Sequence, residues 1–292
     1  MDDSAHREPV LETAARSPWR SRIELEFARA PEGETYLRRQ RAAYPYHLCK
    51  PYRYPGDPAG MATLYLQSCA GGIYAGDRLE ERIRVGAGAA AQVTTQAASI
   101  VHSMIGAAAF QSVEVEAEAG AFAEYLPDPL ILFPHASFET RLRIRAAEGA
   151  TVLACDSFLM HDPDAADGCF DRLSAEIAAE TTDGRLLALD RFEIDGATMR
   201  RGLAGLSGRF AAHGSLWALG REDATDGVVD AMRERLSAVS GIHAGASRLP
   251  NGAGAAARIL AEDGFALRAG LFAAWSGARF ALTGRLPEPR RK

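Results

Sequence analysis

Hydrophobic and polar residues alternate with a period of two through much of the first two thirds of the chain. Ile23, Leu25 and Phe27 alternate with charged neighbours, and the same alternation recurs in segments 113–118 and 141–145. A period of two places successive side chains on opposite faces of a β-strand. The pattern predicts a mainly β protein, in which a row of glutamates at 114–118 and a row of arginines at 141–145 can pair across neighbouring solvent faces.

Four strand-turn-strand units follow one another between residues 78 and 194. Each unit has a glycine in its turn, at positions 88, 120, 149 and 184, so that the glycines are 32, 29 and 35 residues apart. A glycine at a fixed place in each turn fits a backbone with positive φ. The repeat favours a stack of β-coils, each burying its apolar face on the next, although the period does not distinguish this fold from a plain β-sandwich.

The last third of the chain changes to helical spacing. Apolar residues recur every three or four positions in segments 227–240 and 263–278, which predicts two helices, with a short strand at 257–260 between them. Four prolines between residues 45 and 58 exclude a helix or a central strand there. We expect a flexible arm at 1–20, a single β-rich domain at 21–285 with a helical subregion at about 224–280, and a basic tail at 286–292.

Composition narrows the class of protein. The 292 residues carry 33 basic and 38 acidic side chains, a net charge of −5, which argues against a nucleic-acid partner. We expect neither a signal peptide nor a membrane span, because no apolar run reaches the roughly 18 residues that a spanning helix needs. The four cysteines form no C-x-x-C pair, so free thiols in a reducing, cytoplasmic location are expected.

The segment GGIYAGD, residues 71–77, is the densest unusual motif. Its spacing matches neither of the glycine-rich phosphate loops, and no lysine follows it. We expect a tight turn in which the Asp77 carboxylate bonds to neighbouring amides. Thr94, Thr95 and Gln96 end the apolar strand that follows, without an adjacent base that would make a threonine nucleophilic.

A second candidate segment lies at residues 156–169. Asp156, His161 and Cys169 occur there among three further aspartates. Carboxylate, imidazole and thiolate groups together suit a borderline divalent metal such as nickel or zinc. An acidic surface loop is the alternative, since the sequence does not show whether these side chains converge.

The order of these motifs resembles the urease accessory protein UreD family, called UreH in some organisms. The likeness rests on GGIYAGD followed by TTQAAS at 94–99, on YLPDPLILF at 125–133 and on GRLLALDRFEIDG at 184–196, and it covers roughly residues 20–285. The resemblance implies a right-handed, β-helix-like scaffold with two C-terminal α-helices and no enzymatic activity.

The same resemblance implies a role, partners and a set of polar residues. The family binds the urease apoprotein together with UreF and the GTPase UreG, and it assists nickel insertion, with no tightly bound cofactor and nickel only in transit. Polar tunnels are proposed to carry the metal, and Gly71, Gly72 and Gly76 would fix the turn that aims Asp77. The candidate lining residues are Asp77, Glu80, Thr94, Thr95, Gln96, Ser99 and Asp156.

The sequence also departs from the family pattern. Ile100 and His102 stand where the family has lysine and an aromatic residue, and Cys169 stands where it has glutamate. One hypothesis is that His102, His161 and Cys169 supply softer metal ligands in compensation. Two other functions stay open: a divergent paralogue that acts as a structural, protein-binding β-repeat module, and a β-helical carbohydrate-active enzyme. The enzyme would need paired carboxylates about 5–10 Å apart, for which Asp77 and Asp156 are the conceivable pair.

Overall fold

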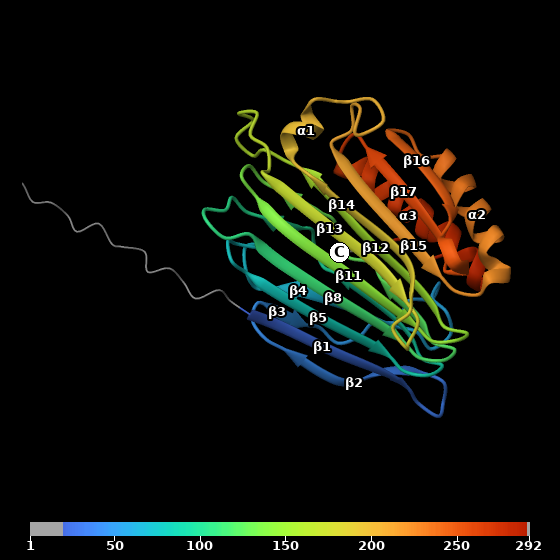
Figure 1. The fold of residues 1–292 in the computed structure, drawn as a ribbon. Coiled ribbons are helices and arrows are strands. Elements are labelled where there is room, and N and C mark those ends of the chain that lie inside the picture. Colours follow the sequence, from blue (N-terminus) through green and yellow to red (C-terminus); the bar gives the residue numbers. More distant parts are fainter. Residues whose placement is uncertain (1–19, 291–292) are drawn as a thin grey trace, which may run out of the picture.

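Two large β-sheets form the body of the molecule. The computed structural model describes residues 20–290, so the predicted arm at 1–20 lies outside the described residues except for Arg20, which begins the first strand. The first sheet has seven strands and the second ten, and they stack as two layers (Figure 1). In spatial order the first sheet contains β14 (Leu186–Ile194), β13 (Arg172–Glu180), β11 (Ser137–Ala146), β8 (Ala109–Ala117), β5 (Arg78–Val85), β1 (Arg20–Arg29) and β2 (Thr35–Ala42).

The second sheet carries the rest of the strands. Its order is β16 (Ile242–Arg248), β17 (Gly254–Ala261), β15 (Ala212–Leu219), β12 (Thr151–Met160), β9 (Phe122–Tyr125), β6 (Ala90–Thr95), β4 (Ala62–Ser68) and β3 (Tyr46–Leu48). Two short strands complete it, because β10 (Leu130–Leu132) pairs in parallel with both β12 and β7 (Ser99–Val101). The proline-rich segment supplies only β3, at the edge of the sheet, as its composition predicts.

Three of the four predicted units are coils that cross between the sheets. β5, β8 and β11 pair in parallel in the first sheet, and β6, β9 and β12, which follow them, pair in parallel in the second. The turn glycines Gly88, Gly120 and Gly149 have φ of 64°, 66° and 73°, as the repeated turns require. Mainly β architecture with stacked, solenoid-like coils is therefore confirmed.

The fourth unit differs from this expectation. β13 and β14 form an antiparallel hairpin within the first sheet, so the chain does not cross to the second sheet after Gly184. The position beside β12 in the second sheet is taken by β15, which pairs with it antiparallel. The hairpin therefore ends the stack of coils.

The outer face of the first sheet carries alternating rows of charge, as the sequence pattern predicts. One row runs across neighbouring strands through Glu180, Arg145, Glu116, Arg84, Glu26 and Arg39. In the adjacent row the guanidinium of Arg143 lies 4.0 Å from the Glu114 carboxylate. Each such cross-strand pair contributes about 0.2–1 kcal/mol, and the rows mark this face as the solvent side.

Helices cover the outer face of the second sheet. α2 (Thr225–Ser237) and α3 (Gly264–Thr283) pack on β15, β16 and β17 around a shared apolar core (Figure 1), and a short α1 (Gly196–Arg200) follows β14. Asp263 caps α3 by accepting a hydrogen bond from the amide of Ala266 at 2.8 Å. Two short 3-10 turns lie at Glu222–Ala224 and Pro250–Gly252. No helix within residues 20–290 is long and apolar enough to cross a membrane.

A buried ionic network fastens α3 to the second sheet. The Arg279 side chain is fully buried, and it donates to the Glu124 carboxylate at 2.8 and 2.5 Å and to Asp57 Oδ1 at 2.6 Å. Trp275 Nε1 donates to Glu124 at 2.9 Å. Arg290, from the predicted basic tail, donates to Asp57 at 2.6 Å and lies over the Tyr54 ring. At least this tail residue therefore belongs to the ionic network.

Candidate functional site

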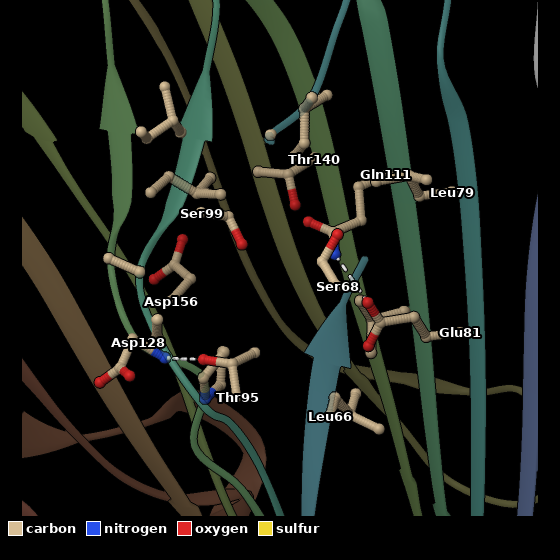
Figure 2. Close-up of a pocket in the computed structure, with 18 of the residues that line it drawn as sticks. Leu66, Ser68, Leu79, Glu81, Thr95, Ser99, Gln111, Asp128, Thr140 and Asp156 are labelled. Carbon is tan, nitrogen blue, oxygen red and sulfur yellow. Dashed lines mark hydrogen bonds between the residues drawn. The ribbon is translucent and has the colours of Figure 1, made fainter. Parts of the chain in front are cut away.

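A cavity of about 270 Å³ lies between the two sheets, beside the GGIYAGD loop. Its walls come from the inner faces of β5, β8 and β11 on one side and of β4 and β12 on the other. The opening is framed by the loops at 70–73 and 95–99. Figure 2 shows Glu81, Gln111 and Thr140 on one wall and Ser99 and Asp156 on the other, with their side chains directed into the space between.

The charged groups of this cavity all have one sign. Four acidic residues line it, Asp77, Glu81, Asp128 and Asp156, and the described lining contains no lysine, arginine or histidine. The remaining polar groups are hydroxyls, amides and the Cys155 thiol, which donates to the carbonyl of Pro127 at 3.7 Å. Such a cavity attracts cations, because low-dielectric walls focus the field of the carboxylates into it.

Most of the polar residues singled out from the sequence do line this cavity. Asp77, Thr95, Gln96, Ser99 and Asp156 belong to the lining, as do the loop glycines Gly71 and Gly72. The Asp77 carboxylate accepts a hydrogen bond from the amide of Tyr74 at 2.9 Å, which is the predicted turn. Gly72 has a φ of 148° and Gly76 a φ of 79°, so this loop needs glycine at both positions.

Two of the candidate lining residues lie elsewhere. Glu80 is on the outer face of β5, because the inner face of that strand carries Leu79 and Glu81. Thr94 faces away from the cavity, and its hydroxyl donates to the carbonyl of Leu126 at 2.6 Å. These two residues do not line this cavity, since a strand's period of two separates each from its cavity-facing neighbour.

Glu81 is the functional candidate that the sequence reasoning missed. The residue is 4% exposed, and its carboxylate accepts hydrogen bonds from Tyr46 at 2.8 Å, Gln111 at 2.8 Å and Tyr125 at 3.1 Å. Burial raises the pKa of Glu81, whereas these three hydrogen bonds lower it. In the sequence, Glu81 lies two residues from each of the apolar residues Leu79 and Ile83, so it shares their face of the strand.

Asp156 faces the cavity from the opposite wall (Figure 2). It lies on β12, and the Ser215 hydroxyl of the neighbouring strand β15 donates to its carboxylate. Burial raises the pKa of Asp156 to about 6, with the hydrogen bond from Ser215 acting in the opposite direction. A substantial fraction of Asp156 is therefore protonated at mildly acidic pH.

The three proposed soft ligands do not line the cavity. His102 stacks on Tyr74 at a centroid distance of 4.6 Å, and its Nε2 lies 3.0 Å from the carbonyl of Gly71. The Phe133 ring contacts both His102 and His161, at centroid distances of 5.5 and 5.9 Å. No three histidine, cysteine, aspartate or glutamate side chains gather as a metal-binding group anywhere in the described part of the chain. His102, His161 and Cys169 therefore do not form the compensating site.

Comparison with known proteins shows which family the chain belongs to. The family model described as UreD urease accessory protein matches residues 20–292. The chain belongs to the UreD family. A UreD 1 urease accessory protein from Pseudomonas syringae pv. syringae (strain B728a) is 39% identical over 268 residues, which are 92% of this chain and 94% of the relative. A UreD 1 protein from Methylorubrum populi is also 39% identical, over 99% of this chain and 96% of the relative.

Membership in the UreD family confirms the resemblance that the motifs indicated. A more distant member, UreD 1 from Bradyrhizobium sp. (strain BTAi1), is 36% identical over 89% of this chain. The family description supports an accessory role in urease maturation. The matched residues include both sheets and both long helices, so the cavity lies inside the UreD domain.

Proposed function

We propose that this UreD-family chain is a non-enzymatic scaffold and metallochaperone, and that nickel passes through its cavity on the way to the urease active site. The observation that carries the proposal is the lining of the cavity, with four acidic residues and no cationic residue among the described residues. A divalent cation entering such a space gains electrostatic energy, and an anion is repelled.

The donor set favours transit over permanent binding. Hydroxyl, amide and carboxylate oxygens dominate the lining, with one thiol, Cys155. Nickel binds more strongly to imidazole and thiolate sites than to isolated oxygen donors. A mostly oxygen-lined path therefore lowers the barrier for Ni²⁺ without trapping it.

The proposal includes the partners that the family resemblance implies. The urease apoprotein receives the metal, and UreF and the GTPase UreG complete the assembly, in the cytoplasm and without nucleic acid or membrane. The net charge of −5 fits a protein that meets other proteins and a cation rather than nucleic acid.

Urease activation in cells tests this proposal. A urease operon is expressed with this gene deleted and with it restored, and the activity and nickel content of purified urease are measured. We expect nickel-poor, inactive urease after deletion and recovery of both quantities on restoration. Urease that is equally loaded in both strains would refute the proposal, and urease that is nickel-free in both would refute it as well.

A further inference from the structure

The end of the described chain returns to the outer face of the second sheet. α3 ends at Thr283, and residues 285–290 then form a strap beside the loop at 54–58. The strap contains no helix or strand, and no backbone–backbone hydrogen bond to the described part of the chain holds it. The Arg285 side chain donates to the carbonyl of Asp57 at 3.4 Å. Side-chain contacts and packing therefore attach the strap to the rest of the molecule.

One arginine makes the shortest of these attachments. Arg290 Nε donates to the Gln92 side chain at 2.8 Å, and Arg290 Nη2 donates to Asp57 Oδ1 at 2.6 Å. The guanidinium lies 4.1 Å from the ring centroid of Tyr54 and 5.5 Å from that of Trp275, and the side chain is 6% exposed. Arg290 is therefore the anchor of the strap.

The buried ionic network stays balanced without this anchor. Asp57 Oδ1 accepts a hydrogen bond from Arg279 as well as from Arg290, each at 2.6 Å. If the strap leaves, Asp57 keeps Arg279 as its counter-ion, so no buried charge is left uncompensated. Docking also has a cost, because Arg290 Nη1 is buried and makes no hydrogen bond to any described residue. Both features bring the released state closer in free energy to the docked state.

The strap forms part of the wall of a groove. This groove, of about 460 Å³, lies between α3 and the outer face of the second sheet. Its lining includes Leu126, Phe272 and Trp275, and the strap residues Pro289 and Arg290 complete it. Release of the strap therefore widens the groove and exposes more of its apolar, aromatic surface.

We propose that residues 285–290 are a reversible strap, which closes one side of this groove when docked and opens it when released, while the rest of the fold stays intact. The docked state depends on Arg290 and on a close approach at Gly56. A Cβ on Gly56 would lie 3.0 Å from the carbonyl oxygen of Leu286 and 3.1 Å from Glu288 Cγ. A methyl group at Gly56 would therefore push the strap outward without removing a charge.

Trypsin cleavage of the Arg285–Leu286 bond, followed by mass spectrometry of the tag-free, full-length chain, tests the strap. A protease binds an extended segment, so the cleavage rate reports the population of the released state when opening and closing are faster than cleavage. We expect wild type to lose residues 286–292 at least tenfold faster than it is cleaved after Arg82, because Arg82 lies inside β5 and its cleavage requires unfolding.

Two variants should shift the strap toward release. We expect Arg290→Gln and Gly56→Ala each to raise the rate of cleavage after Arg285 at least fivefold and the fluorescence of the apolar dye anilinonaphthalene sulfonate at least twofold. Their urea midpoints should fall much less than that of Arg279→Met, since Asp57 keeps its counter-ion. Two controls should match wild type: Arg201→Gln, in an exposed loop, and Gly227→Ala, at an open position in α2.

Three results would overturn the inference. Cleavage after Arg285 no faster than after Arg82 would show that the strap leaves only when the protein unfolds. Unchanged cleavage after Arg285 in both Arg290→Gln and Gly56→Ala would show that these contacts do not hold it. Unchanged dye fluorescence in a variant whose strap is rapidly cleaved would show that the strap does not close the groove. If Arg290→Gln fails to fold, Gly56→Ala decides, because it keeps every charged group.

Discussion

Replacement of Arg279 by methionine should destabilise the protein strongly. The guanidinium makes three hydrogen bonds to Glu124 and Asp57 at 2.5–2.8 Å and is fully buried. Methionine fills much of the same volume but leaves the Glu124 carboxylate without its counter-ion, since the remaining donors, Trp275 and Gln92, are neutral. Removing one partner of a buried pair costs about 3–5 kcal/mol.

That cost is a large share of the total stability. Domains are stable by about 5–15 kcal/mol, and 1 kcal/mol shifts the melting temperature by roughly 2–4 °C at 150–250 residues. We therefore expect a fall of about 10 °C, measured by urea and thermal unfolding with tryptophan fluorescence as the probe. Arg268→Met, at an exposed position on the same helix, is the control and should stay within about 0.5 kcal/mol of wild type.

A double variant separates the charge effect from packing. In Arg279→Met/Glu124→Gln the carboxylate nearest the lost guanidinium is neutral, so we expect most of the lost stability to return. A loss below about 1 kcal/mol for Arg279→Met would show that solvent reaches Glu124 and that the network does not fasten α3. The same conclusion would follow if the double variant were no more stable than the single one.

Two further predictions concern the cavity and its loop. The raised pKa of Asp156, about 6, means that the folded state holds a proton which the unfolded chain releases near pH 4, so this group contributes stability at low pH that is lost as the pH rises to 6. Asp156→Asn should remove that dependence, so that the variant gains about 2 kcal/mol relative to wild type between pH 4 and pH 6.5, measured by urea midpoints; a constant difference would contradict the pKa. Gly72→Ala should distort the loop, because its Cβ would meet the carbonyl of Ile100 at 2.5 Å and the His102 ring at 2.7 Å with φ at 148°. We expect a loss of at least about 1 kcal/mol in unfolding experiments, whereas Gly227→Ala, at an open position in α2, should not destabilise; equal stability of the two variants would refute the loop argument.

The coils could be predicted from the sequence because their signals are local. Alternation within β8 and β11 and a glycine in each turn specify a strand, its buried face and its end. The β13–β14 hairpin shares the same local signals, yet it pairs within the first sheet, while β15 takes the position beside β12. That pairing joins residues about sixty positions apart, which a local pattern does not contain.

The cavity was predictable only in part. The GGIYAGD turn aims Asp77 through its own backbone, so Asp77 was found from local sequence. Glu81 and Asp156 face each other across two sheets, and their proximity depends on how the coils stack. The alternation along β5 alone would have identified Glu81, not Glu80, as the cavity-facing residue, because Leu79 and Ile83 define the inner face of that strand. Arg290 joins the ionic network because the end of the chain lies beside Asp57, and no local sequence pattern indicates this contact.

The nickel content of urease in cells with an obstructed cavity tests the central claim most directly. Thr140→Trp places an indole on the cavity wall, and Ser112→Trp places the same group on the outer face of the neighbouring strand β8. With both variants present at wild-type levels, we predict that Thr140→Trp yields urease with less than a tenth of the wild-type nickel per active site, while Ser112→Trp yields fully loaded urease. Full loading of urease by Thr140→Trp would contradict passage of nickel through the cavity.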